Sequence, residues 1–146
     1  MQCECCAAMW RSASLTVPSV VVVAIYRRSG GAFNVFIHIV ARILDALGVY
    51  GRHRIVIVGD YNVDFLVESS ELSKLKDLMQ SYGFRPTIDQ PTKNEICMDS
   101  IFVCTRTVQC RSEVIQNGIL DHSAQQVCLD IGDSDIQLGV PCSLDK

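Results

Sequence analysis

The chain has 146 residues, of which 49% are hydrophobic and 20% charged, with a formal net charge of −3 and a pI near 5.5. This length suits one domain with a sizeable core, and the composition excludes an intrinsically disordered chain. The acidic balance argues against a broad electrostatic grip on nucleic acid, so such a function would need a local basic surface. The tight basic groups, which could equally be solvated loop residues, are Arg27, Arg28, Arg52, His53 and Arg54.

The first strong pattern is residues 19–26 (SVVVVAIY), a β-branched apolar run that predicts a strand covered on both faces. Apolar residues then recur at helical spacing over residues 33–47, and Gly48 stands where a helix is expected to stop. Residues 55–58 predict a second buried strand. This strand leads directly into a Gly-Asp-Tyr-Asn segment, residues 59–62.

A second amphipathic helix is predicted from Leu72 to Tyr82, with Ser69 or Ser70 as its N-cap and Gly83 at its end. A polar loop with two prolines follows. Short apolar runs then predict strands at residues 99–103, 114–115 and 126–131, whereas residues 132–146 show no periodicity and are expected to form an irregular tail. Strands interleaved with two helices indicate the α/β class.

The eight cysteines are not read as a disulfide framework, because the N-terminal residues lack the basic-then-apolar order of a signal peptide. We expect reduced cysteines that mostly fill the core of an intracellular protein, nuclear or cytoplasmic. The cluster Cys3, Cys5 and Cys6 lacks the spacing of a zinc site. Residues 17–26 are too short an apolar run to span a bilayer, so no membrane association is expected.

Three polar clusters stand where predicted strands begin or end: Asp60 with Asn62, Asp99, and Asp121 with His122. Loop residues at strand ends are a common way to bring distant catalytic groups together. Carboxylates bind a hard cation such as Mg²⁺, while acid, base and amide groups move protons and stabilise a phosphate. Taken singly, each cluster has a structural alternative as a turn, a helix cap or a surface pair.

The combination resembles a known family. Residues 55–64 resemble the apolar strand and GDFN motif of the endonuclease/exonuclease/phosphatase (DNase-I-like) superfamily, and residues 98–102 (MDSIF) and 120–125 (LDHSAQ) resemble two later motifs, the last one SDH. Residues 24–28 (AIYRR) resemble its Tyr-Arg segment. The loop at residues 90–93 (QPTK) is similar to that of the endonuclease domain of non-LTR (LINE-like) retrotransposons.

The resemblance implies roles for four residues around the phosphate. Asp60 would orient or deprotonate the attacking water. Asn62 would contact the phosphate or help to hold that water, and Tyr26 would contact the phosphate. Thr92, in the Pro-Thr loop, is grouped with the substrate-binding residues.

The remaining implied roles concern charge and proton transfer. Asp121 would belong to the metal site, for Mg²⁺ or Mn²⁺. His122 would stabilise the scissile phosphate or relay a proton. Asp99 would hold His122, because a carboxylate partner fixes the tautomer of an imidazole and raises its basicity.

The chain also departs from the family pattern. Leu120 replaces the usual Ser of the SDH motif, and Tyr61 replaces the usual Phe of GDFN. The N-terminal half of the family's domain, which supplies a metal-binding Glu, has no counterpart here. Residues 1–131 are therefore expected to form a truncated domain, the C-terminal part of a four-layered α/β sandwich with a mainly antiparallel or mixed sheet and two flanking helices.

The resulting expectation is metal-dependent phosphodiester hydrolysis, as in a retrotransposon DNA endonuclease, with weak or no activity and a loosely bound metal ion. DNA is the expected partner, although the motifs do not separate DNA from RNA or a small phosphoester. Two alternatives remain open. One is a nuclease or phosphatase completed by a partner chain or by self-association through exposed sheet or apolar surface; the other is a non-catalytic interaction module that kept the fold.

Overall fold

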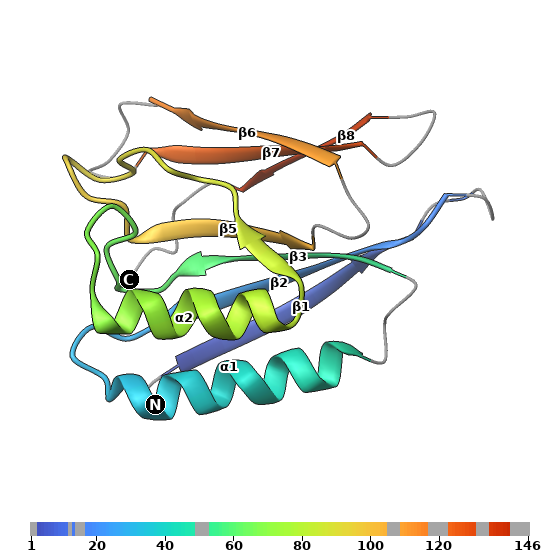
Figure 1. Cartoon of the computed structure of the whole chain (residues 1–146). Coiled ribbons are helices and arrows are strands. Elements are labelled where there is room, and N and C mark those ends of the chain that lie inside the picture. The colour runs from blue at the N-terminus through green and yellow to red at the C-terminus, as the bar shows by residue number, and fades with distance from the viewer. Residues whose placement is uncertain are drawn as a thin grey trace.

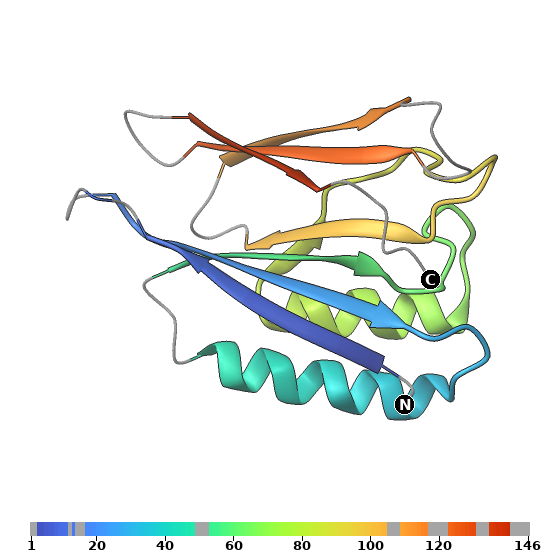
Figure 2. The ribbon, with the colours of Figure 1, turned by 180° about the vertical axis from the view of Figure 1, so that it is seen from behind.

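The computed structural model describes residues 3–11, 13, 17–48, 53–104, 109–116 and 123–130, and the backbone of residues 135–140. Its elements form three layers: two helices, a five-stranded sheet and a three-stranded sheet (Figures 1 and 2). In chain order they are β1 Cys3–Trp10, β2 Val20–Arg27, α1 Phe33–Leu47, β3 Arg54–Asp60, α2 Ser70–Ser81, β4 Phe84–Pro86, β5 Asp99–Cys104, β6 Gln109–Ile115, β7 Ala124–Asp130 and β8 Asp135–Val140.

The larger sheet has the order β1-β2-β3-β5-β4 and is mixed. β2 is parallel to β3 and antiparallel to β1, while β3 and β4 are both antiparallel to β5. The smaller sheet, β6-β7-β8, is antiparallel. The predicted α/β class, with a mixed sheet and two flanking helices, is confirmed.

The core fills both faces of the larger sheet. On one face lie apolar residues of the two helices, with Phe36 and Leu44 from α1 and Leu75 from α2 each no more than 1% exposed. On the other face, Val127 and Leu129 of β7 are fully buried. The apolar runs of β2, β3 and β5 therefore reflect strands covered from both sides, as continuous β-branched sequences indicate.

Both helices follow their predicted limits. α1 ends at Leu47 and Gly48 is its C-cap. Ser69 is the N-cap of α2, since its hydroxyl accepts a hydrogen bond from the backbone N–H of Leu72 at 3.1 Å. Gly83, just beyond α2, has a φ of 85°, a left-handed conformation that glycine adopts without strain. No helix among the described residues is long and apolar enough to span a membrane.

Two strands depart from the sequence-based expectation. β4 lies in the segment predicted as a proline-containing loop; an edge strand tolerates Pro86 because its missing N–H is not needed for pairing. The prediction of an irregular tail is wrong for residues 135–140. These residues form β8 and pair antiparallel with β7, from Gln125↔Val140 to Asp130↔Asp135. The alternation Ile, Leu, Val at every second position of DIQLGV was the overlooked signal.

Candidate functional site

Three of the predicted site residues lie in one row across neighbouring strands. Tyr26 at the end of β2 pairs in register with Asp60 at the end of β3, and Asp60 pairs with Asp99 at the start of β5. Residues paired in this way project from the same face of a sheet. We call these three residues, whose catalytic roles are predicted from the sequence, the catalytic row: Tyr26, Asp60 and Asp99. Segments 34 and 39 residues apart in sequence thus meet at one end of the sheet.

The row continues to a residue that the sequence reasoning did not assign to the site. Glu4 of β1 pairs in register with Tyr26. Its side chain is exposed, whereas Tyr26 and Asp60 are half-buried and Asp99 is 4% exposed. Only the register of β1 against β2 reveals this placement, and sequence patterns do not fix that register without a recognisable hairpin turn.

The loop after β3 is held in a specific conformation. The carboxylate Oδ1 of Asp60 accepts a hydrogen bond from the backbone N–H of Asn62 at 2.9 Å, and Asn62 has a φ of 47°. Asn is one of the few residues that adopts this left-handed region readily. Gly59 is required for a different reason: a Cβ there would collide with the carbonyl of Ile25 on β2. The Gly-Asp-x-Asn pattern is therefore a geometric requirement here.

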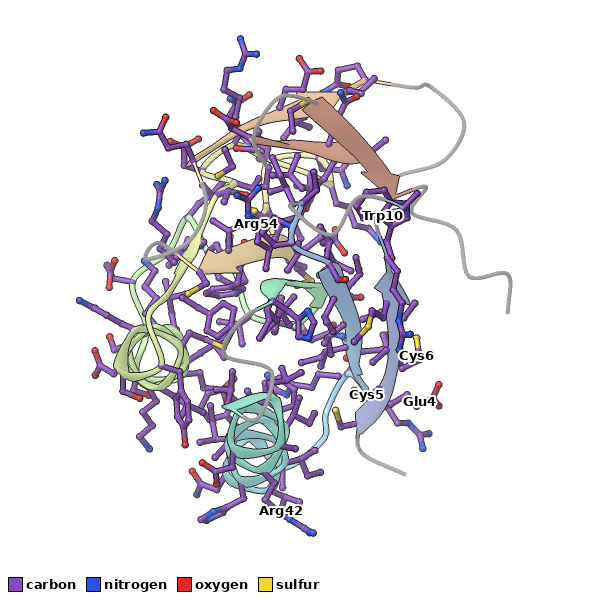
Figure 3. All side chains as sticks on the ribbon, turned by 90° about the vertical axis from the view of Figure 1, so that its right-hand side faces the viewer. Glu4, Cys5, Cys6, Trp10, Arg42 and Arg54 are labelled. Carbon is purple, nitrogen blue, oxygen red and sulfur yellow. The ribbon has the colours of Figure 1, made fainter. Side chains whose placement is uncertain are left out.

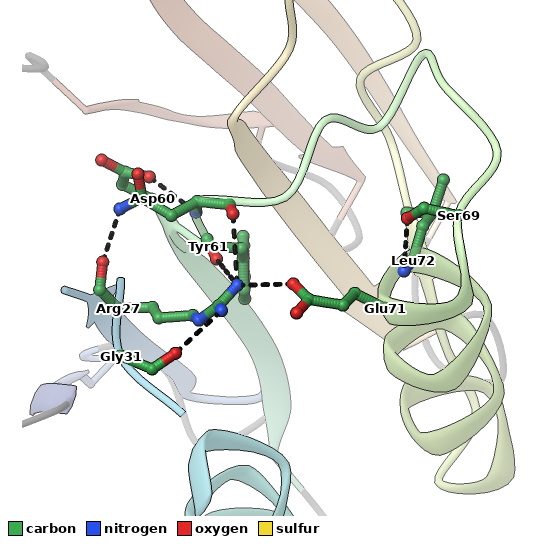
Figure 4. Close-up of polar contacts among 8 residues, drawn as sticks. Arg27, Gly31, Asp60, Tyr61, Ser69, Glu71 and Leu72 are labelled. Atoms are coloured by element: carbon green, nitrogen blue, oxygen red, sulfur yellow. Dashed lines mark hydrogen bonds and ion pairs between the residues drawn. The ribbon is translucent and has the colours of Figure 1, made fainter. Parts of the chain in front are cut away.

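Arg27 anchors this loop from the opposite face of the sheet (Figure 4). Its Nη1 donates to the carbonyls of Tyr61 at 3.4 Å and Asn62 at 3.2 Å, and forms an ion pair with Oε2 of Glu71 at 3.0 Å. Its Nη2 donates to the carbonyl of Gly31 at 3.1 Å. In return, Nδ2 of Asn62 donates to the carbonyl of Arg27 at 2.5 Å. The loop that carries Asp60 and Asn62 is thus joined to both β2 and α2.

The reading of Arg27 as a solvated loop residue is wrong. Arg27 as a whole is 5% exposed, and its guanidinium lies over the rings of Phe33 at 5.0 Å and Phe36 at 5.6 Å. Because strand side chains alternate between faces, Arg27 points toward α1 while Tyr26 points toward the layer of β6, β7 and β8. A buried guanidinium whose two terminal nitrogens are both hydrogen-bonded offers no surface charge to a nucleic acid.

Asp99 is surrounded by buried hydrogen-bond donors. The hydroxyl of Thr92, which is 1% exposed, donates to Oδ2 of Asp99 at 3.1 Å. The carbonyl of Asp99 accepts from Nε2 of Gln125 at 3.0 Å and from the thiol of Cys97 at 3.2 Å. Burial raises the pKa of Cys97 to about 11, which keeps this donor protonated. The hydroxyl of Thr92 therefore helps to hold the carboxylate of Asp99, and its predicted contact with substrate stays a prediction.

Asp121 and His122 lie outside the described residues, so their predicted meeting with Asp99 stays a prediction. The residue that follows them is placed: the backbone N–H of Ser123 donates to the carbonyl of Thr92 at 2.6 Å. Among the described residues, no three His, Cys, Asp or Glu side chains lie close enough to hold a metal ion together. Those residues alone do not complete a metal site.

No protein-family model and no curated protein matches the chain. Among solved structures, it is similar to an endonuclease/exonuclease/phosphatase family protein from Bacteroides thetaiotaomicron, with a TM-score of 0.66 and 16% identity over 89% of this chain and 57% of that one. It is also similar to a mannosyl-6-phosphatase from the same organism, with a TM-score of 0.57 and 13% identity over 77% of this chain and 52% of that one. The chain therefore has the fold of these proteins and spans little more than half the length of each.

Proposed function

We propose that the chain is a phosphoester hydrolase domain that cleaves phosphodiesters, related to the DNA endonucleases of non-LTR retrotransposons. The observation that carries this proposal is the catalytic row, where Tyr26, Asp60 and Asp99 share one sheet face with Asn62 fixed beside them. The fold of the two similar structures supports a phosphoesterase in general terms. The retrotransposon assignment depends on the sequence resemblance, with Thr92 in the Pro-Thr loop as its most specific residue.

Each residue of the site has a chemical role in this proposal. The half-exposed carboxylate of Asp60 takes the proton of an attacking water, because a carboxylate in a fixed turn is a positioned general base. The phenol of Tyr26 donates a hydrogen bond to a phosphate oxygen, and the amide of Asn62 orients the same group. Arg27 keeps Asn62 in place from behind, so its role is positioning.

Proton delivery to the leaving oxygen is assigned to His122, oriented by Asp99. Support comes from Ser123, the next residue, whose backbone bonds to Thr92, which in turn bonds to the carboxylate of Asp99. We also propose Asp121 as a metal ligand and Mg²⁺ or Mn²⁺ as a weakly held cofactor. Such an ion would supply charge stabilisation on the phosphate.

The activity we propose is weak, because the described residues bring no three metal-ligating side chains together and would hold a metal ion loosely. The test is nicking of supercoiled plasmid DNA with Mg²⁺. Slow nicking is expected that disappears in Asp60→Asn and His122→Ala and persists in Asp77→Asn, a control on the exposed side of α2. Nicking that survives both site substitutions would refute the assigned residues, and rapid nicking would refute the weak activity.

The alternative of completion by a second chain is favoured by one observation, the unprotected edge of β1. β1 has eight residues, pairs only with β2 in its sheet, and six of its side chains are exposed (Figure 3). The edge strand β4 is only three residues long, and β6 exposes the charges of Arg111 and Glu113, devices that discourage edge pairing. β1 carries a single charge, Glu4.

Size-exclusion chromatography under reducing conditions tests this alternative. A self-associated species is expected that Ala8→Lys on β1 converts to monomer, since a lysine on an edge opposes strand addition. Ser73→Lys, on the exposed side of α2, should leave the elution unchanged. A wild-type monomer at all concentrations would leave self-association without support.

A further inference from the structure

A pocket of about 270 Å³ lies apart from the catalytic row and shares none of its residues. Its walls come from α2, from β4 and the segment after it, from β6, and from the loop between β3 and α2. The pocket is slightly smaller than the roughly 300 Å³ at which drug-sized ligand sites begin, so it suits one small molecule or one monomer unit of a polymer.

The hydrogen-bond donors available in this pocket are mainly cationic. The hydroxyl of Thr87 already donates to the carbonyl of Ile101 at 3.0 Å, and that of Ser112 donates to the carbonyl of Thr87 at 2.5 Å. These two hydroxyls can therefore only accept a hydrogen bond from a ligand. The side-chain donors left for a ligand are therefore the charged groups of Lys76 and Arg85, which line the pocket.

These two cations are accessible to a ligand. Arg85 is exposed on β4 and forms no ion pair with another described residue. Lys76 forms an ion pair with Glu68, but at 3.7 Å and with the Glu68 side chain 82% exposed, a geometry that contributes little. A ligand phosphate would give both cations a closer, charge-assisted partner.

The other residues that line the pocket indicate which chemical groups the ligand carries besides its anionic group. Phe65, Pro86 and Ile88 supply apolar wall. The exposed carboxylate of Asp89 is the one acidic group of the lining and can accept a hydrogen bond from a ligand hydroxyl or amino group. A bare inorganic anion would use the cations and leave this acceptor and the apolar wall without partners.

We propose that this pocket is a second ligand site, which binds a nucleotide-like phosphate: one phosphate on Lys76 and Arg85, and a sugar or base against Phe65 and Asp89. The ligand is either a free mononucleotide or one unit of a nucleic-acid strand, since both present the same chemistry. The site is independent of catalysis, because no residue of the catalytic row lines it.

The pocket contains its own reporter, the thiol of Cys110, which is free and half-buried in the lining. Burial raises the pKa of Cys110, with the nearby charge of Arg85 acting in the opposite direction. The thiolate is the reactive form, so labelling is best followed at a pH of about 8.5, where thiolate is more abundant. A bound ligand blocks the pocket and slows this labelling.

The experiment measures maleimide labelling of Cys110 by peptide mass mapping, in the whole chain, with AMP, adenosine or an eight-residue oligothymidylate as probe. AMP or the oligonucleotide should slow labelling several-fold, whereas adenosine should not. Arg85→Gln should weaken protection about tenfold, the typical effect of losing one charge-assisted hydrogen bond. Arg111→Gln is the matched control, since it removes the same charge from the neighbouring position to Cys110 on β6, where side chains alternate between faces.

The probes also identify the source of the ligand. Protection by AMP identifies a free nucleotide as sufficient, and protection by the oligonucleotide alone identifies a strand. Equal protection by adenosine, no protection by any probe, or equal weakening in Arg85→Gln and Arg111→Gln would each overturn the proposal. None of these results depends on nuclease activity, so the second site and the proposed function can fail separately.

Discussion

The two ends of the residue row on the larger sheet are built differently. Asp99, at the inner end, is 4% exposed, and side chains of Thr92, Gln125 and Cys97 donate hydrogen bonds to it. Glu4, at the outer end, is exposed on a strand that contacts chiefly β2 (Figure 3). A side chain on this sheet is held in one position where the layers packed on the sheet supply hydrogen-bond partners. The row is therefore preorganised at β3 and β5, whereas its β1 residue, Glu4, is exposed to solvent.

Replacing Arg27, which anchors the loop after β3, is expected to cause the largest loss of stability at the inner end of the row. Arg27→Met removes a buried guanidinium that bonds three carbonyls and Glu71, so we expect a loss of about 3 kcal/mol or more in the free energy of unfolding. Denaturant unfolding followed by circular dichroism measures the loss. Arg28→Met, the exposed neighbour, should change stability by less than about 0.5 kcal/mol. Equal effects of the two substitutions would contradict the anchoring role.

Thr92→Val tests the inner end directly. It keeps the shape of the side chain but removes the hydroxyl that bonds the carboxylate of Asp99, and a hydrogen bond to a charged group is worth about 2 kcal/mol. Thr87→Val is the matched control, since its hydroxyl bonds a neutral carbonyl and should cost about 1 kcal/mol. Thermal unfolding of the two variants side by side measures the difference. A smaller loss for Thr92→Val than for Thr87→Val would contradict the importance of this contact.

Tyr61→Phe is expected to increase the stability of the inner region of the larger sheet. The phenol oxygen of Tyr61 is buried and has no hydrogen-bond partner, and the Tyr61 ring packs in edge geometry against the rings of Phe36, Phe65 and Phe102. Removing an unsatisfied buried hydroxyl should stabilise the fold by about 1 kcal/mol. Tyr82→Phe, whose exposed hydroxyl bonds Asp45, should bring no such gain. A destabilised Tyr61→Phe would mean that the hydroxyl has a favourable partner.

The same substitution has a pH signature. Burial raises the pKa of Tyr61, so the unfolded chain loses this proton first as the pH rises above about 10. The free energy of unfolding is therefore unaffected by this group below that pH and falls as the pH rises above it, because the folded chain keeps a proton that the unfolded chain releases. Tyr61→Phe should therefore flatten the alkaline fall in stability, as read from the unfolding midpoint between about pH 9 and pH 11.

The sequence was informative where one local pattern determines the outcome. The helical period predicts α1, the Ser69 cap predicts the start of α2, and the apolar runs predict β2, β3 and β5. The motifs predicted Tyr26, Asp60 and Asp99 as site residues, and strand pairing places the three side by side, while their catalytic roles stay predictions. These features depend on periodicity or on short-range geometry, such as the lack of room for a Cβ at Gly59.

The remaining features depend on contacts between distant segments. Whether the arginine after Tyr26 is buried depends on which face of β2 the helices cover, which alternation alone does not reveal. The placement of Glu4 depends on the register of β1. The short strands β4 and β8 depend on pairing with β5 and β7, because β4 has only three residues and the brief alternation in β8 is a weak signal without a partner strand.

The smallest effect is expected at the outer end of the row. Glu4→Gln removes the charge of an exposed carboxylate on an edge strand, so the free energy of unfolding should change by less than about 0.5 kcal/mol. Asp99→Asn makes the same chemical change at the inner end, where the Thr92 hydroxyl loses a charged acceptor, and should cost about 2 kcal/mol. Both substitutions replace a carboxylate by an amide, so a difference in their cost reflects the position of each residue in the row. If Glu4→Gln proves as costly as Asp99→Asn, then β1 has partners in solution that fix Glu4, and the outer end is organised by a second chain.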